Sequence, residues 1–171
     1  MEVRQIANSA AALRLGYWLG RNMPLKIGYA LADGLSGLLA RRKDSALMRI
    51  LHSNLSVVLG PDASEQQVHA TARAVLGHAG RSYIDLYHAV GVGPEAYVSS
   101  VKNGPLVDHY LDRMHNEGRG IVFVSAHMSN FDLAGLAIAY QGVRMTALGH
   151  AAPSSGYSLQ NQIRVAAGID V

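Results

Sequence analysis

One short apolar run constrains the fold of this 171-residue chain more than any other feature. Residues 121–125 read Ile-Val-Phe-Val-Ser and follow a Gly-Arg-Gly turn. A β-branched and aromatic run of this kind is typical of a strand buried on both faces, as in a parallel sheet. The sequence after it predicts a helix at 130–140, a strand at 143–148, a helix at 158–167 and a last strand from 169. This alternation predicts an α/β fold with a parallel sheet, incomplete at the C-terminus because it stops on a strand.

An incomplete sheet would leave apolar side chains without cover. Parallel strands are normally covered on both faces, yet no helix follows the last predicted strand. We therefore expect Val122, Val124, Ala147 and Ile169 to leave apolar surface exposed, and the isolated chain to be poorly soluble or self-associating.

The first hundred residues predict helices instead of strands. Pro24 suits the first turn of a helix, Asp44 suits a cap, and Ser64 with Gln67 forms the pattern of a capping box. Glycine and proline pairs end two of the segments. The helical segments are expected at 9–20, 24–40, 44–59, 64–90 and 105–116.

The charge of the chain is unevenly distributed. Residues 1–50 carry eight basic and three acidic side chains, whereas residues 51–171 carry seven basic and nine acidic ones. A basic and apolar start suggests contact with a surface that bears phosphates, such as a lipid membrane. Few aromatic residues and no polar basic stripe argue against nucleic acid. An interfacial anchor could include Leu13, Tyr17, Trp18, Leu25, Ile27 and Tyr29, although packing within the protein explains them equally well.

Several site classes are excluded or disfavoured by composition. The chain has no cysteine, which excludes disulfides, thiolate zinc sites and thiol catalysis. No apolar stretch reaches the length of a membrane-spanning helix, and no signal peptide is expected.

A histidine and an aspartate stand where an α/β sheet normally binds ligands. His127 follows the predicted strand directly, and Asp132 lies five residues later in the first turn of the next helix. The carboxylate could fix the tautomer of the imidazole, whose other nitrogen would then take a proton from a hydroxyl or an amine. In the serine-protease triad an aspartate orients a histidine in the same way, but here no serine of the enzyme takes part. Two structural alternatives stay open: Asp132 could cap the helix together with Ser129, and His127 could be a buried, hydrogen-bonded histidine.

Residues 118–132 resemble the active-site block of the bacterial late lipid A acyltransferases, a family that includes the phosphatidylinositol-mannoside acyltransferases. That block has a glycine-rich turn and an apolar strand before His-x4-Asp/Glu, and often ends in Gly-Asn-Trp-Glu, where this chain has Ser-Asn-Phe-Asp. The resemblance covers about residues 20–171 and extends to segments 48–55, 81–86 and 159–168. The family continues beyond the equivalent of the last residue here, with further strands and substrate-binding motifs.

The resemblance implies direct acyl transfer from an acyl carrier protein or coenzyme A thioester to a hydroxyl of a membrane glycolipid. His127 would be the general base and Asp132 its partner, without a covalent enzyme intermediate or a cofactor. The acceptor would be a lipid A precursor or a phosphatidylinositol mannoside. The fold implied is a parallel sheet of the glycerophosphate-acyltransferase type. Residues 1–43 would associate with the cytoplasmic face of the inner membrane, peripherally or monotopically, and residues 44–171 would form the N-terminal portion of the acyltransferase domain.

Four further residues are candidates for substrate binding. Ser129 and Asn130 lie between the catalytic candidates, His150 ends the second predicted strand, and Arg164 could hold a phosphate. Ordinary exposed side chains explain His150 and Arg164 better than substrate binding does.

Two other functions stay open. A metal-dependent hydrolase could use His127, Asp132 and His150, although the chain lacks a second dense block of ligands and we expect no metal. A non-catalytic membrane-binding or partner-binding fragment of the same fold is the third interpretation.

Overall fold

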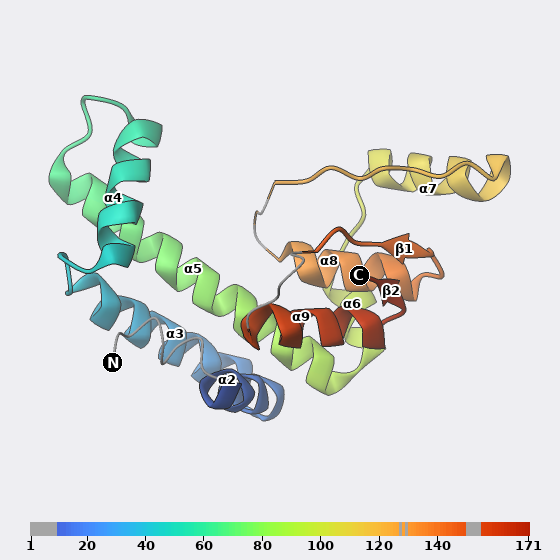
Figure 1. Cartoon of the computed structure of the whole chain (residues 1–171), viewed down its shortest axis with the longest axis horizontal. Helices are drawn as coiled ribbons and strands as arrows, with labels where there is room; N and C mark the ends of the chain where they lie inside the picture. The colour runs from blue at the N-terminus through green and yellow to red at the C-terminus, as the bar shows by residue number, and fades with distance from the viewer. Residues whose placement is uncertain (1–9, 127, 129, 150–154) are drawn as a thin grey trace. The chain divides into compact units, whose positions relative to one another are not determined.

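The computed structural model describes residues 10–126, 128, 130–149 and 155–171 (Figure 1). These residues form two compact units: the N-terminal unit, Leu15–His88, and the C-terminal unit, Ala89–Val171 with residues 10–14. The helices in the described part are α2 (Ala10–Asn22), α3 (Leu25–Ala40), α4 (Ala46–Leu59), α5 (Glu65–Val92), α6 (Pro94–Ser100), α7 (Pro105–Glu117), α8 (Phe131–Tyr140) and α9 (Ser155–Ala166). The strands are β1 (Met145–Thr146) and β2 (Ile169–Asp170).

The helix starts follow the capping residues closely. Pro24 is the N-cap residue of α3 and so lies one position before the first turn in which it was expected. The capping box at α5 is confirmed: the Gln67 N–H donates to Ser64 Oγ at 3.2 Å, and the Ser64 N–H donates to Gln67 Oε1 at 2.8 Å. At α4 the expected cap was wrong by one residue, because the Ser45 hydroxyl, instead of Asp44, accepts the Met48 N–H at 3.3 Å.

The helix ends depend on glycine in two places where the chain must turn sharply. Gly60 closes α4 with φ 87°, and Gly168 turns the chain from α9 into β2 with φ 83°. A left-handed conformation of this kind suits glycine because it has no Cβ. Both stops were predicted, whereas the short helix α6 after Gly93 was not.

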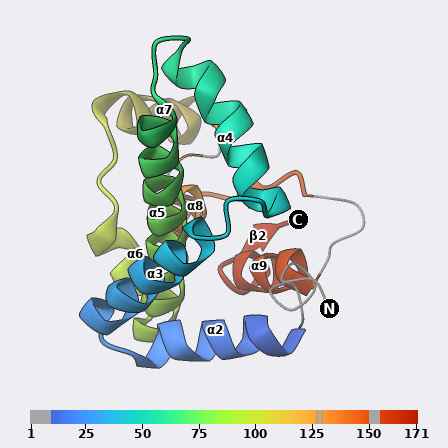
Figure 2. The same ribbon diagram turned by 90° about the vertical axis from the view of Figure 1, so that its left-hand side faces the viewer.

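In the N-terminal unit, α3 runs across α5 through small residues (Figure 2). A Cβ at Gly28 would lie 2.6 Å from Ile84 Cγ2, and one at Gly80 would lie 3.0 Å from Ala32 Cβ. Gly28, Ala32 and Ser36 follow at four-residue spacing and so share one face of α3. Small side chains on this face let the two helix backbones approach closely.

Polar contacts flank this close approach. Arg81 of α5 is ion-paired with Asp33 of α3, with Nε 2.9 Å from Oδ1. The hydrogen bonds from Arg81 hold the pKa of the Asp33 carboxyl below its ordinary value. The Tyr29 hydroxyl donates to Asp85, and this bond together with burial raises the pKa of Tyr29 to about 12. These contacts fix which side of α3 faces α5.

A small apolar core joins the C-terminal end of α3 to α4 and α5. Its buried members are Ala40, Met48 and Ala72, against which Leu51, Leu55 and Leu76 pack. Met48 is fully buried. Each of the helices α3, α4 and α5 therefore contributes a buried residue to this core.

In the C-terminal unit, α6 and α8 pack against each other. Leu136 and Ala137 of α8 are fully buried, and Tyr97 meets Tyr140 edge to face with ring centroids 6.5 Å apart. The strands β1 and β2 pair in parallel with Met145 opposite Ile169, and the Ala147 N–H extends the ladder to Asp170 O at 2.7 Å.

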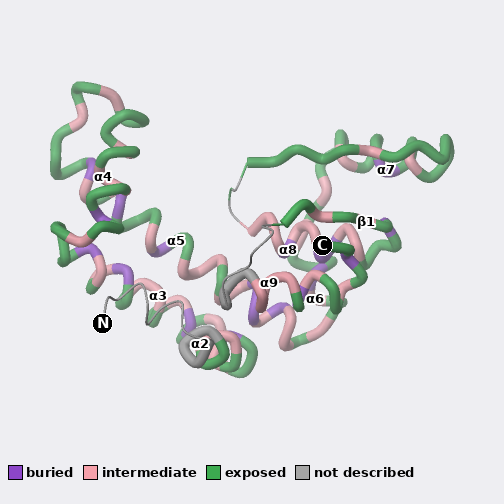
Figure 3. Tube along the Cα trace, viewed as in Figure 1, coloured by how far each residue is buried: buried purple, intermediate pink, exposed green. Residues whose placement is uncertain are grey.

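Within the part of the chain that the structure describes, the predicted parallel sheet is reduced to this small strand pair. In the described residues 121–126 no strand forms, and Val122 and Val124 are 88% and 93% exposed (Figure 3). The prediction of a doubly buried strand there was wrong, because a strand requires a hydrogen-bonded neighbour and no described segment pairs with this one. The expected strand at 143–148 is likewise only two residues long. The expected exposure is confirmed at Val122 and Val124, whereas Ala147 is only partly exposed. The expectation was wrong at Ile169, which is buried.

Two glycines on α2 give a matched test of the N-terminal unit. A Cβ at Gly20 would lie 2.7 Å from Tyr87 Cβ, which is fixed to the backbone, whereas one at Gly16 meets nothing within 4 Å. We predict that Gly20→Ala lowers the free energy of unfolding, because α2 must move away from α5. Gly16→Ala should raise it by about 0.5–1 kcal/mol, since alanine favours the helix. Urea unfolding followed by circular dichroism measures both, and equal effects would contradict this packing.

Candidate functional site

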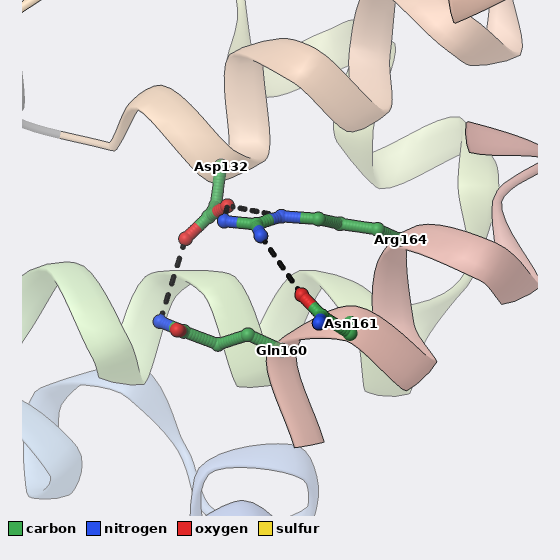
Figure 4. A network of polar contacts seen from close by, with 4 residues as sticks. All are labelled: Asp132, Gln160, Asn161 and Arg164. Atoms are coloured by element: carbon green, nitrogen blue, oxygen red, sulfur yellow. Dashed lines mark hydrogen bonds and ion pairs between the residues drawn. The ribbon is translucent and has the colours of Figure 1, made fainter. Parts of the chain in front are cut away.

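An ion pair between two helices of the C-terminal unit fixes the carboxylate of Asp132 (Figure 4). Asp132 lies in the first turn of α8, and Arg164 lies in the last turn of α9. Arg164 Nε donates to Asp132 Oδ1 at 3.0 Å, and an Nη atom donates to the same oxygen at 2.5 Å. Because donor and acceptor are both charged, these bonds are stronger than neutral ones.

Two amide side chains complete the network. Gln160 Nε2 lies 3.5 Å from Asp132 Oδ2, so it approaches the oxygen that Arg164 does not use. Asn161 Oδ1 accepts from Arg164 at 3.0 Å and steadies the guanidinium (Figure 4). The Arg164 and Asp132 side chains are only 16% and 11% exposed. The carboxylate is therefore held nearly out of water, with its orientation set from α9.

The local sequence explains this arrangement. Gln160 and Arg164 are four residues apart, which places both on one face of α9. Gly168 then turns the chain into β2, whose pairing with β1 returns it to the strand that follows α8. An acidic residue near a helix start is also favoured by the helix dipole. Residues 132 and 164 are thus brought together although 32 positions separate them.

The structure describes only part of the predicted site. Asn130 directly precedes α8 as its N-cap residue, and Asp132 and Arg164 are in contact. The interpretation of Arg164 as an exposed helix arginine was wrong, because its side chain is mostly buried against Asp132. The predictions for His127, Ser129 and His150 lie outside the described residues.

Sequence reasoning missed Gln160 and Asn161. Their only signal is the run Gln-Asn-Gln-Ile-Arg at 160–164, in which polar residues recur at helical spacing beside an arginine. Among the described residues no group of three or more histidine, cysteine or acidic side chains could hold a metal ion.

Comparison with known proteins identifies the family. Residues 8–171 match the model of the bacterial lipid A biosynthesis acyltransferases. The chain belongs to this family. No curated protein and no solved structure matches it.

Membership confirms the resemblance to this family. It implies that the chain is an acyltransferase, which uses an acyl donor and a lipid acceptor. Asp132 lies five residues after His127 in the sequence, and its partnership with that histidine stays a prediction. None of the described helices of this acyltransferase is long and apolar enough to cross a membrane.

A double-mutant cycle tests whether Asp132 and Arg164 act as a pair. We predict that Asp132→Asn and Arg164→Gln each lower the free energy of unfolding, because each leaves a nearly buried partner unpaired. The double variant should lose less than the sum, with a coupling on the order of 1–3 kcal/mol.

The exposed pair Arg113–Glu117 on α7 is the matched control in the same unit, and its coupling in Arg113→Gln and Glu117→Gln should be smaller. Strictly additive effects at Asp132 and Arg164 would contradict the ion pair.

Proposed function

We propose that this protein transfers a fatty acyl group from a thioester to a hydroxyl of a membrane glycolipid, with His127 as general base. The donor is an acyl carrier protein or coenzyme A thioester, and the acceptor is of the lipid A precursor or phosphatidylinositol mannoside class. One observation carries the proposal in a chain of this family. Asp132 lies five residues after His127 in the sequence, and its carboxylate is fixed by Arg164.

The fixed carboxylate supports an orienting role for Asp132. Arg164 and Gln160 approach it from α9, and a carboxylate has about four acceptor positions, so it can accept another hydrogen bond. A bond from one ring nitrogen of His127 would hold the imidazole in the tautomer whose other nitrogen is a base. Arg164 is then a positioning residue that acts through Asp132, instead of a phosphate ligand.

The proposed reaction needs one proton carrier. The acceptor oxygen attacks the thioester carbonyl carbon while its proton passes to His127. The tetrahedral intermediate then collapses, the carbon–sulfur bond breaks, and the imidazolium returns the proton to the leaving thiolate. Ser129, Asn130 and His150 are proposed to bind substrate near this centre, because they lie next to the pair or at the end of the second predicted strand.

The proposed location is the cytoplasmic face of the inner membrane, where the acceptor glycolipid lies. Residues 1–43 would make the peripheral contact through their basic and apolar side chains, and residues 44–171 would carry the acyltransferase portion.

Removal of the imidazole tests the mechanism. We predict that His127→Ala lowers acyl transfer about 10²–10⁴-fold, because the acceptor hydroxyl loses its base. Asp132→Asn should retain measurable transfer, since the imidazole is still present but poorly oriented. Transfer of a radiolabelled acyl group into the glycolipid fraction measures both. His115→Ala on α7 is the control and should leave transfer unchanged; transfer by His127→Ala at the rate of this control would refute the proposal.

Chelation separates the proposed reaction from metal-dependent hydrolysis. Because the proposed steps involve no metal, we predict that prolonged dialysis against EDTA leaves acyl transfer unchanged. If turnover disappears and returns with Zn²⁺, the hydrolase with His127, Asp132 and His150 as ligands is the better account.

A further inference from the structure

Helix α3 exposes an unbroken apolar face. Exposed positions recur along this helix (Figure 3). Those from residue 27 to residue 38 contain no polar side chain. They are Ile27, Ala30, Leu31, Gly34, Leu35 and Leu38. The four large side chains are between 52% and 57% exposed. A surface helix of a water-soluble domain normally has the reverse pattern, with its apolar stripe facing the core.

The rotation of α3 about its axis is fixed, so this face cannot simply turn inward. The opposite side holds the close approach at Gly28 and Ala32 and the ion pair of Asp33 with Arg81. Rotation of the leucines toward α5 would place bulky side chains where a single Cβ already collides with Ile84. The apolar face therefore needs a partner outside this unit.

The dimensions of the face suit a membrane surface. Leu38 lies eleven helical steps after Ile27, which at about 1.5 Å per residue is roughly 16 Å. This is about half the hydrocarbon thickness of a bilayer, so the face cannot span it but can lie in its plane.

The charges around the face favour an anionic lipid surface over a protein groove. Lys26 precedes the face and the basic cluster Arg41–Lys43 follows it, all of them exposed. The only acidic residue between positions 15 and 43 is Asp33, which is paired on the α5 side. Cations at both ends of an apolar stripe complement the phosphates above an acyl layer.

We propose that the outward face of α3 is the lipid-binding surface of this protein, with its large apolar side chains in the headgroup–acyl boundary and its flanking cations on anionic phosphates. This inference rests on the proposed location at a membrane but not on the acyl-transfer chemistry. It also corrects the predicted anchor: Tyr17 stacks edge to face on Tyr87, and Tyr29 is hydrogen-bonded to Asp85. Both tyrosines therefore contact α5.

Co-sedimentation of the full chain with vesicles tests the proposal. The vesicles contain phosphatidylcholine with or without phosphatidylglycerol. We predict that Leu31→Gln/Leu35→Gln weakens partitioning onto the anionic vesicles roughly tenfold or more, because two apolar side chains no longer enter the boundary. Both side chains are exposed, so the circular dichroism spectrum and urea midpoint should be unchanged. Leu106→Gln/Val122→Gln removes two other exposed apolar side chains and should leave partitioning unchanged.

A charge variant separates the two components of binding. Arg41→Gln/Arg42→Gln/Lys43→Gln should weaken binding to the anionic vesicles and flatten its dependence on salt, while leaving the weaker binding to phosphatidylcholine unchanged. Equal partitioning of the wild type and the α3 variant would overturn the proposal. So would a lipid-free dimer of the wild type that the α3 variant converts to monomer, because the face would then be a contact between copies.

Turnover with a detergent-dispersed acceptor distinguishes this proposal from the proposed function. The α3 variant should keep wild-type transfer in detergent and lose it on vesicles. If His127→Ala keeps transfer while the α3 variant still loses vesicle binding, the proposed chemistry fails and the lipid surface stands.

Discussion

The ion pair between Arg164 and Asp132 is the interaction on which the site depends. It joins the first turn of α8 to the last turn of α9 and holds a carboxylate nearly out of water. A nearly buried charge is tolerated only where a partner and further hydrogen bonds compensate it, and Arg164, Gln160 and Asn161 provide them. A carboxylate fixed in this way can orient an imidazole more strictly than one on a mobile surface side chain.

The N-terminal unit follows a different constraint. Close approach of α3 and α5 through small residues leaves no space between them for large apolar side chains. Leu31, Leu35 and Leu38 of α3 therefore lie on its outer face. The polar contacts of Asp33 and Tyr29 lie toward α5. This packing leaves α3 with an exposed apolar face bounded by basic residues, and the proposed lipid-binding surface rests on that face.

Local features of the chain could be predicted from the sequence because neighbouring residues determine them. Side chains within one or two turns determine the capping box at Ser64 and the helix ends at Gly60 and Gly168. They also determine that most of these segments are helical. The family could be recognised for the same reason, since the residues of the block at 118–132 are contiguous.

Non-local features could not be predicted in this way. The run 121–125 has the composition of a buried strand, but a strand forms only beside a partner, which the composition of one segment does not reveal. The contact of Arg164 with Asp132 spans 32 positions and depends on how Gly168 and the strand pair return the chain. The exposure of the apolar face of α3 could not be predicted either, because an apolar stripe on a helix normally indicates burial. The stripe is exposed here because the small residues on the opposite side of α3 pack against α5.

The stoichiometry of the reaction tests the central claim most directly. Purified protein is mixed with an acyl thioester and a glycolipid acceptor, and the released thiol and the acylated glycolipid are quantified together by mass spectrometry. Direct transfer predicts equal amounts of the two products and little thiol release when the acceptor is omitted. Thiol release at an undiminished rate without acceptor, accompanied by free fatty acid in place of acylated glycolipid, would contradict the account.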